Sequence, residues 1–326
     1  MSVTIKDIAR IAGVSYSTVS KALNDSPLVK KKTKEAILKV AEQLGYQPNM
    51  AAKSLVSKKS QIIGVAWPTV ERPAWSTLIT KINDLLGQQA YHTLLSINPV
   101  DSAITIFNRF HVDAILLFQE ESRGRPGLPQ STVPILCYGK PEGQLSAVDV
   151  NRRKAMFAAV RYLYERNHRR LAYIGDLSPN DLIQQEKYIG FAEAIIQFGL
   201  PTHPLMTMNT AGNSADQGYR LTKQLLHSAY EPTAIVSGSY DITVGVMRAL
   251  KEEGVIVPAD LSLISYDNIP QMASFDVPIT AVGAPIERIA AGIVDSLFAI
   301  INKTKLSPFC KQIEIELVER ASCQPL

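Results

Sequence analysis

Hydrogen-bonding side chains are concentrated near the N-terminus of this 326-residue chain. The run Ser15-Tyr16-Ser17-Thr18-Val19-Ser20-Lys21 supplies five hydroxyl groups and one ammonium group. Such groups form hydrogen bonds with the base edges and phosphate oxygens of nucleic acids. The run is therefore a candidate hydrogen-bonding surface, provided that a rigid element presents these side chains together.

Two short helices are predicted to provide that element. Thr4 and Asp7 have the spacing of a helix cap, and Gly13 breaks the first helix. The second helix starts after Ser15 and turns Val19 and Leu23 inward. The apolar residues of the first helix share one face: Ile5, Ile8, Ala9 and Ile11. Two short helices joined at a glycine turn predict a helix-turn-helix, and a plain helical hairpin in a core is the alternative.

A third helix is expected from Lys31 to Leu44, with Gly45 just past its end. It opens on Lys30-Lys31-Lys32 and lacks a good side-chain cap. Positive charges at a helix N-terminus oppose the helix dipole. Nearby phosphate would relieve this conflict, and a frayed first turn is an equal alternative.

Positive charge is concentrated in the same part of the chain. Residues 1–60 hold eleven Lys or Arg against four Asp or Glu, whereas the remaining residues hold 23 basic and 26 acidic side chains. This asymmetry is expected when only the N-terminal segment meets a polyanion. Lysine-rich solvated helix faces are also common, so the charge alone favours nucleic acid only weakly.

The sequence contains none of several common catalytic or cofactor-binding motifs. The sequence lacks G-x-x-x-x-G-K-[ST], G-x-S-x-G, G-x-G-x-x-G and C-x-x-C, and its five histidines show no metal-ligand spacing. Three scattered cysteines do not form a disulfide framework. The chain enters its first predicted helix without a leader, and no apolar run reaches about 18 residues. We therefore expect a cytoplasmic protein that is not an enzyme, has no metal or cofactor and has no membrane partner.

From Gln61 onward, strands alternate with helices. Buried parallel strands separated by helices predict a doubly wound α/β architecture in two lobes. The expected strands are 62–67, 93–97, 114–118, 133–138, 171–174, 234–237 and 262–266, and the expected helices are 78–89, 104–109, 152–167, 188–198, 216–228 and 242–253.

Motifs in both parts resemble one known family. T-I-x-D-I-A, A-G-V-S-x-x-T-V-S and L-G-Y-x-P-N-x-x-A precede the strand Ile62-Ile63-Gly64-Val65. This combination resembles the lactose/galactose repressor (LacI/GalR) family of bacterial transcription regulators. The resemblance implies a small all-α helix-turn-helix head and an α/β two-lobed, periplasmic-binding-protein-like core with parallel doubly wound sheets.

The resemblance also implies domain limits. The helix-turn-helix domain is expected at 1–47, a hinge helix or linker at 48–60, and an effector-binding and dimerisation domain at 61–326. Lobe one is expected at about 61–157 and 285–312, and lobe two at about 158–284 and 313–326. The three chain crossings between lobes are expected near 156–160, 283–285 and 311–315.

For the head, the resemblance implies that the second helix enters the major groove. It assigns base contacts to Tyr16, Ser17 and Lys21. Phosphate contacts are expected from Ser15, Thr18, Ser20 and Asn24, whose side chains are better placed for phosphate oxygens, and each is alternatively a cap or a solvated group. Lysine cannot form the bidentate fork of arginine with guanine, so Lys21 is expected to discriminate weakly at its base pair.

The segment from Asn49 to Ser60 is helix-compatible but too short to be stable alone. It resembles the family's hinge helix, which folds on operator DNA and enters the minor groove. Asn49, Ala52 and Leu55 match the positions involved, with Leu55 as a wedge between two base pairs. A flexible linker whose Leu55 packs on the body is the alternative.

For the body, the resemblance implies a small effector between the lobes. The candidate effector-binding residues follow predicted strands or open helices: Trp75, Tyr138, Lys187, Asn213, Tyr240 and Asp267. Asp267 lies in S-Y-D-N, which resembles the family's G-Y-D-N, whose aspartate bonds a ligand. Trp75 either stacks on the ligand or packs near a hinge. Asp241 either bonds the ligand or caps the following helix, and the cap is favoured.

Several positions depart from the family pattern. Lys187 replaces a typical arginine, Tyr240 replaces an asparagine, and Gly283-Ala284 replaces a basic residue and a glutamine. An ordinary hexose is therefore less expected than an unusual sugar, a sugar phosphate or no ligand at all.

The sequence thus predicts a homodimeric transcriptional regulator that binds near-palindromic double-stranded operator DNA under the control of a small, sugar-like effector. A repressor is favoured over an activator. A ligand-independent regulator with a degenerate cleft is a further alternative. A transport-type sugar-binding protein is a distant one, because it would not explain the basic N-terminal segment.

Overall fold

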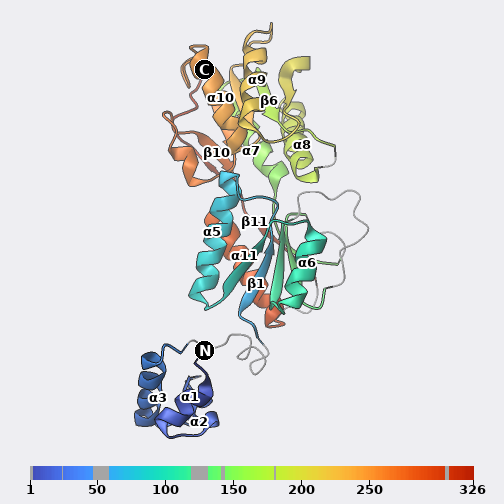
Figure 1. Cartoon of the computed structure of the whole chain (residues 1–326). Coiled ribbons are helices and arrows are strands. Elements are labelled where there is room, and N and C mark those ends of the chain that lie inside the picture. The colour runs from blue at the N-terminus through green and yellow to red at the C-terminus, as the bar shows by residue number, and fades with distance from the viewer. Residues whose placement is uncertain are drawn as a thin grey trace. The chain divides into compact units, whose positions relative to one another are not determined.

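The computed structural model describes residues 3–23, 25–46, 59–118, 131–140, 144–179, 181–304 and 308–326. The chain forms two compact units, residues 1–60 and 61–326, which are described separately. The first unit contains the helices α1 (Ile5–Ala12), α2 (Tyr16–Leu23) and α3 (Lys31–Gln43) (Figure 1).

Local signals in the sequence fix the ends of these helices. The predicted capping box is present, since the Asp7 carboxylate accepts from the Thr4 backbone N–H at 3.0 Å and from its hydroxyl at 2.8 Å. Gly13 ends α1 in the left-handed region, at φ 65°. The first turn of α3 has no side-chain cap at Lys30, as expected from its lysines.

The three helices enclose a small core. Ile8, Val19 and Ile37 supply one fully buried side chain from each helix. Ile11 was predicted to share the buried face of α1, and this was wrong, because it is 54% exposed near the end of the helix. The described part of the first unit is thus a helix-turn-helix followed by a supporting third helix.

The second unit contains two lobes, each built on a six-stranded sheet (Figure 1). Lobe one has the strand order β11-β5-β4-β3-β1-β2, with all neighbours parallel. Helices α5 and α11 pack side by side on one face of this sheet, and α6 covers the other. The strands are β1 (Ile62–Ala66), β2 (His92–Ser96), β3 (Ala114–Phe118), β4 (Ile135–Tyr138), β5 (Ser146–Val150) and β11 (Cys310–Ile313), and the helices are α5 (Pro73–Gln88), α6 (Val100–Arg109) and α11 (Ile286–Ile301).

Lobe two has the order β12-β10-β9-β8-β6-β7, and its strands are parallel except for the antiparallel pair β10 and β12. Its strands are β6 (Leu171–Gly175), β7 (Thr207–Asn209), β8 (Ala234–Ser237), β9 (Ser262–Tyr266), β10 (Thr280–Gly283) and β12 (Glu316–Val318). Its helices are α7 (Arg152–Glu165), α8 (Leu182–Gln197), α9 (Ala215–Leu226) and α10 (Tyr240–Glu252), with 3₁₀ turns η1 (Pro204–Met206) and η2 (Pro270–Ala273).

The predicted fold class is confirmed, and the crossings between lobes are now located. The chain passes from β5 to α7 at Asn151, from β10 to α11 at 284–285, and from β11 to β12 at 314–315. The first crossing was expected near 156–160, but α7 packs on α8 and β10 and so belongs wholly to lobe two. The sequence pattern did not predict β5, β7 or the elements after Tyr266. Within the residues described, no helix has the length and apolarity needed to cross a membrane.

Candidate functional site

The predicted base-contacting side chains lie on the exposed face of α2. Tyr16, Ser17 and Lys21 are exposed, whereas Val19 and Ala22 are buried on the opposite face. Ser17 and Lys21 are four residues apart, so they project toward the same side of the helix. The tight turn at Gly13 and the core beneath Val19 hold this face in a fixed orientation.

Two of the predicted phosphate-contacting hydroxyls, those of Ser15 and Thr18, are linked to each other. The Ser15 hydroxyl lies 3.0 Å from the Ser17 hydroxyl and 2.8 Å from the Thr18 hydroxyl. It also accepts from the Thr18 backbone N–H at 3.2 Å and so caps α2. Thr18 and Ser20 are partly exposed. The remaining DNA-contacting candidates lie outside the described residues: Asn24, Asn49, Ala52 and Leu55.

In the second unit, a cavity of about 70 Å³ lies between the two lobes, and we call it the inner cavity. Its polar lining comes mainly from the segments that follow parallel strands, which is where ligands bind in open α/β sheets. Lobe one contributes Arg72, Trp75, Phe118 and Tyr138, and lobe two contributes Arg152, Asp181, Gln184, Lys187, Tyr266 and Asp267. Four of the six predicted effector-binding residues therefore line one cavity: Trp75, Tyr138, Lys187 and Asp267.

Lys187 is a buried cation in this cavity, with 3% of its surface exposed. Its Nζ donates to the Gly238 carbonyl at 2.8 Å and lies 4.0 Å from the centroid of the Tyr266 ring. Burial lowers the pKa of the Lys187 ammonium to about 8, although the charge of Asp267 partly opposes this shift. Lys187 lies in the second turn of α8 rather than at its start, because α8 begins at Leu182.

A second buried cation, Arg152, lies at the first crossing between lobes. Its guanidinium donates to the Asp149 carboxylate at 2.5 Å and to the Val150 carbonyl at 3.1 Å. Burial raises the pKa of Tyr138 to about 12, and the nearby charge of Arg152 partly offsets this. Tyr138 is therefore a neutral hydroxyl at physiological pH.

Arg72 and Asp241 connect the two lobes beside the cavity. The Arg72 Nε donates to the Asp241 Oδ2 at 2.9 Å, and the guanidinium lies 4.2 Å from the centroid of the Trp75 ring. Burial raises the pKa of the Asp241 carboxyl, and the hydrogen bond from Arg72 opposes this. The interpretation of Asp241 as a helix cap was wrong, because the Ser239 side chain caps α10. Asp241 is instead the ion-pair partner of Arg72.

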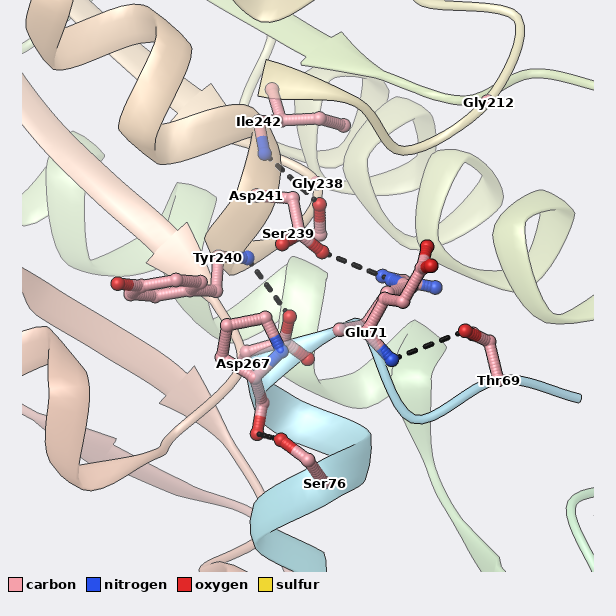
Figure 2. A network of polar contacts seen from close by, with 12 residues as sticks. Thr69, Glu71, Ser76, Gly212, Gly238, Ser239, Tyr240, Asp241, Ile242 and Asp267 are labelled. Carbon is pink, nitrogen blue, oxygen red and sulfur yellow. Dashed lines mark hydrogen bonds and ion pairs between the residues drawn. The ribbon is translucent and has the colours of Figure 1, made fainter. Parts of the chain in front are cut away.

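Asp267 follows β9 with its backbone in the left-handed region, at φ 80°. Its Oδ2 accepts from the Tyr240 backbone N–H at 2.9 Å, whereas the Tyr240 ring extends away from this carboxylate (Figure 2). That ring packs on Phe275 with centroids 5.7 Å apart, and Tyr240 does not line the inner cavity. The structure therefore does not support a ligand contact from the Tyr240 side chain.

Asn213 faces a second, more open space of about 660 Å³, which we call the outer chamber. The two spaces adjoin, since Arg72, Trp75 and Asp181 line both. The Asn213 Oδ1 is buried and has no hydrogen-bond partner among the described residues. Asn213 thus lines the outer chamber and not the inner cavity.

Sequence reasoning did not select Arg152 or Gln184 as ligand candidates. Asp181 caps α8 by accepting from the Ile183 and Gln184 N–H groups, at 2.9 and 3.1 Å. An aspartate at this position is a typical helix N-cap, so the sequence could have shown that the helix starts there. A helix that starts at this point has Gln184 and Lys187 on one face. Arg152 was harder to select, because β5 was not predicted from the sequence and Arg152 was therefore not seen to follow a strand.

Comparisons with known proteins agree with both units. Residues 4–49 match the model for bacterial regulatory proteins of the lacI family, and residues 160–323 match a periplasmic binding protein-like domain. Catabolite control protein A of Priestia megaterium is 28% identical over 331 residues, covering 99% of each chain. The transcriptional repressor PurR of Actinobacillus pleuropneumoniae serotype 3 is 28% identical over 335 residues, again covering 99% of each.

Among solved structures, the fold is shared with the lac repressor dimer bound to operator and the anti-inducer ONPF. The TM-score is 0.84 at 23% identity, and the match covers 99% of this chain and 100% of that one. With a family model on each unit and relatives that match along the whole length, this chain belongs to the lacI family of bacterial regulatory proteins and carries a periplasmic binding protein-like domain.

Proposed function

We propose that this chain is a sequence-specific transcriptional repressor whose affinity for operator DNA is controlled by a small molecule bound between its lobes. The observation that carries the proposal is the pairing, in one chain, of an exposed α2 face with a two-lobed body that encloses a polar cavity. Catabolite control protein A and the repressor PurR, which match nearly the full chain, support the same role.

On DNA, Tyr16, Ser17 and Lys21 read base edges in the major groove. Phosphate contacts come from Ser15, Thr18, Ser20 and Asn24, and minor-groove contacts come from Asn49, Ala52 and Leu55. Two copies of the chain bind the two halves of a near-palindromic operator, since a symmetric dimer matches a symmetric site. The exposed lysines at the start of α3 add attraction for the phosphate backbone.

We propose that residues 1–47 form the DNA-binding domain, 48–60 the hinge, and 61–326 the effector-binding and dimerisation domain. A sugar-like effector contacts Trp75, Tyr138, Lys187 and Asp267, with Asn213 at the outer chamber. Binding shifts the body between two arrangements of its lobes, and the hinge follows by gaining or losing order. The protein works in the cytoplasm and performs no chemistry on its ligand.

The test combines operator selection with ligand screening. A random double-stranded DNA library is selected on the full chain, and gel-shift titrations then give the affinity for the enriched site with and without each compound. A palindromic site that loses affinity with Lys21→Ala is the expected result. If no sequence is enriched over non-specific DNA, the proposed function is wrong.

A thermal-shift screen of sugars and sugar derivatives identifies the ligand, because a compound that binds only the folded state raises its melting temperature. Each hit is then added to the gel shift. A hit that stabilises the protein without changing operator affinity would contradict ligand control by that compound.

A further inference from the structure

The three cations that line the inner cavity differ in their carboxylate partners. Arg72 is 2.9 Å from Asp241, and Arg152 is 2.5 Å from Asp149. Among the described residues, no carboxylate lies within ion-pair distance of the Lys187 Nζ. A buried ammonium without a carboxylate is costly, and an anionic ligand would reduce that cost.

Two carboxylates face Lys187 from a greater distance, and both already accept backbone hydrogen bonds. Asp181 accepts from the first turn of α8, and Asp267 accepts from the Tyr240 N–H. The positive charges of Arg72 and Arg152 also act on Lys187. Both carboxylates are therefore held by backbone N–H donors, and neither forms an ion pair with the Lys187 ammonium.

Gln184 is a second, independent indication of what the ligand must carry, namely a hydrogen-bond donor. It lines the inner cavity, is 4% exposed, and its Oε1 has no hydrogen-bond partner among the described residues. It precedes Lys187 by three residues on α8, so the two side chains share one side of the helix. A buried amide oxygen that lacks a donor is satisfied by an O–H or N–H group of a ligand.

The size of the two spaces limits the rest of the ligand. A cavity of about 150 Å³ accommodates benzene, so the inner cavity, at about 70 Å³, holds only a head group. The remainder extends past Arg72 and Trp75 into the outer chamber, where the buried Asn213 Oδ1 is a second acceptor without a donor. A chain of hydroxyl groups would supply donors along this route.

From these observations we propose that the ligand is a polyhydroxylated carboxylic acid, with its carboxylate on Lys187, its adjacent hydroxyl on Gln184 and its further hydroxyls toward Asn213. The inference rests on the proposed function, because it names the class of molecule that controls operator binding. A carboxylate matches the small inner cavity better than the bulkier, tetrahedral phosphate group does.

The experiment titrates acids and their neutral counterparts into the full chain by calorimetry. The probes are gluconate, glucuronate and glycerate, each paired with a neutral counterpart of similar size: sorbitol, glucose and glycerol. Glucose 6-phosphate tests the phosphate alternative. At least one acid is expected to bind about ten- to a hundredfold more tightly than its neutral partner, because only the acid forms a hydrogen bond between two charged groups, its carboxylate and the Lys187 ammonium.

Proton uptake gives a readout that a purely structural lysine would not show. Because the pKa of Lys187 is about 8 when the cavity is empty, the amine is half protonated at pH 8, and an anion would raise that pKa. Binding at pH 8 therefore takes up about half a proton, measured from the dependence of the heat on the buffer. Affinity is constant below about pH 7 and falls as the pH rises above 8.

Three variants complete the test. Lys187→Met should lose the preference for the acid, whereas Lys251→Met, at a lysine that is 79% exposed in its ion pair with Asp276, should keep it. Gln184→Leu should weaken acid binding without lowering the melting temperature, because it removes an acceptor that has no donor in the empty protein.

Equal affinity for an acid and its neutral partner, binding of the phosphate alone, or binding of none of the acids would each overturn the inference. A neutral sugar that binds and changes operator affinity would leave the proposed function intact. Conversely, an acid that binds through Lys187 but never changes operator affinity would support the inference and contradict ligand control.

Discussion

Gly190 lets α8 approach α7 closely, and α8 carries Gln184 and Lys187. A Cβ atom built at residue 190 would lie 2.8 Å from the Cα of Arg153 and closer still to its carbonyl oxygen. Ordinary Cβ contacts begin at 3.4 Å. In Gly190→Ala, relieving the contact with the Arg153 Cα alone needs a separation of about 0.6 Å, and the closer carbonyl oxygen needs more, against backbone that cannot rotate away.

The free-energy change follows from two opposing effects. Overpacking against backbone costs about 1–3 kcal/mol, and alanine in a helix interior recovers up to about 1 kcal/mol relative to glycine. The net destabilisation of about 1–2 kcal/mol lowers the melting temperature by about 2–8 °C for a body of this size. Differential scanning calorimetry of the full chain measures this shift.

Gly87→Ala is the matched control. Gly87 also lies in a helix, in the last turn of α5, and nothing lies within 4 Å of the Cβ position. The same substitution should therefore raise the stability by up to about 1 kcal/mol. If Gly190→Ala melts at or above the wild-type temperature, the close approach of α7 and α8 does not limit stability and the reasoning is refuted.

Three further predictions concern DNA binding and pH. Lys21→Ala should cost about 1–3 kcal/mol, mostly at one base pair of each half-site; an equal loss on all sequences in a gel shift would make Lys21 a phosphate contact. Leu55→Ser should abolish specific binding and leave weak, salt-sensitive association; unchanged operator affinity would exclude a wedge. Burial lowers the pKa of His168, so its neutral form stabilises the fold above about pH 6.5 and this stability is lost as the pH falls below that value. His168→Gln should flatten the fall in melting temperature between pH 8 and pH 5.

The first unit was predictable because its signals are local. The Thr4 and Asp7 capping box, the left-handed Gly13 and the buried Val19 each act within a few residues of sequence. Ile11 was misassigned because helical periodicity shows only which residues lie on one side of a helix. Tertiary packing decides how many of those residues are buried.

The inner cavity was only partly predictable because it depends on where helices start and on contacts between distant segments. Trp75 and Lys187 were selected because they lie close to the ends of predicted strands and helices. The start of α8 was predicted six residues too late, and Gln184 was therefore not recognised as a helical residue facing the cavity. The Tyr240 ring turns toward Phe275, which lies 35 residues away in sequence. No local pattern encodes that contact, nor the ion pair of Arg72 with Asp241 across the two lobes.

The lysine at position 187 has a physical consequence for ligand choice. An ammonium group has three donors, and here one meets the Gly238 carbonyl while another side of the group lies over the Tyr266 ring. A guanidinium has five donors in a rigid plane and needs more room than the inner cavity of about 70 Å³ leaves. Lys187→Arg should therefore bind the acid less tightly than wild type but more tightly than Lys187→Met, because charge is kept while fit is lost. If arginine restores or exceeds wild-type affinity, charge alone selects the ligand and the shape of the cavity does not.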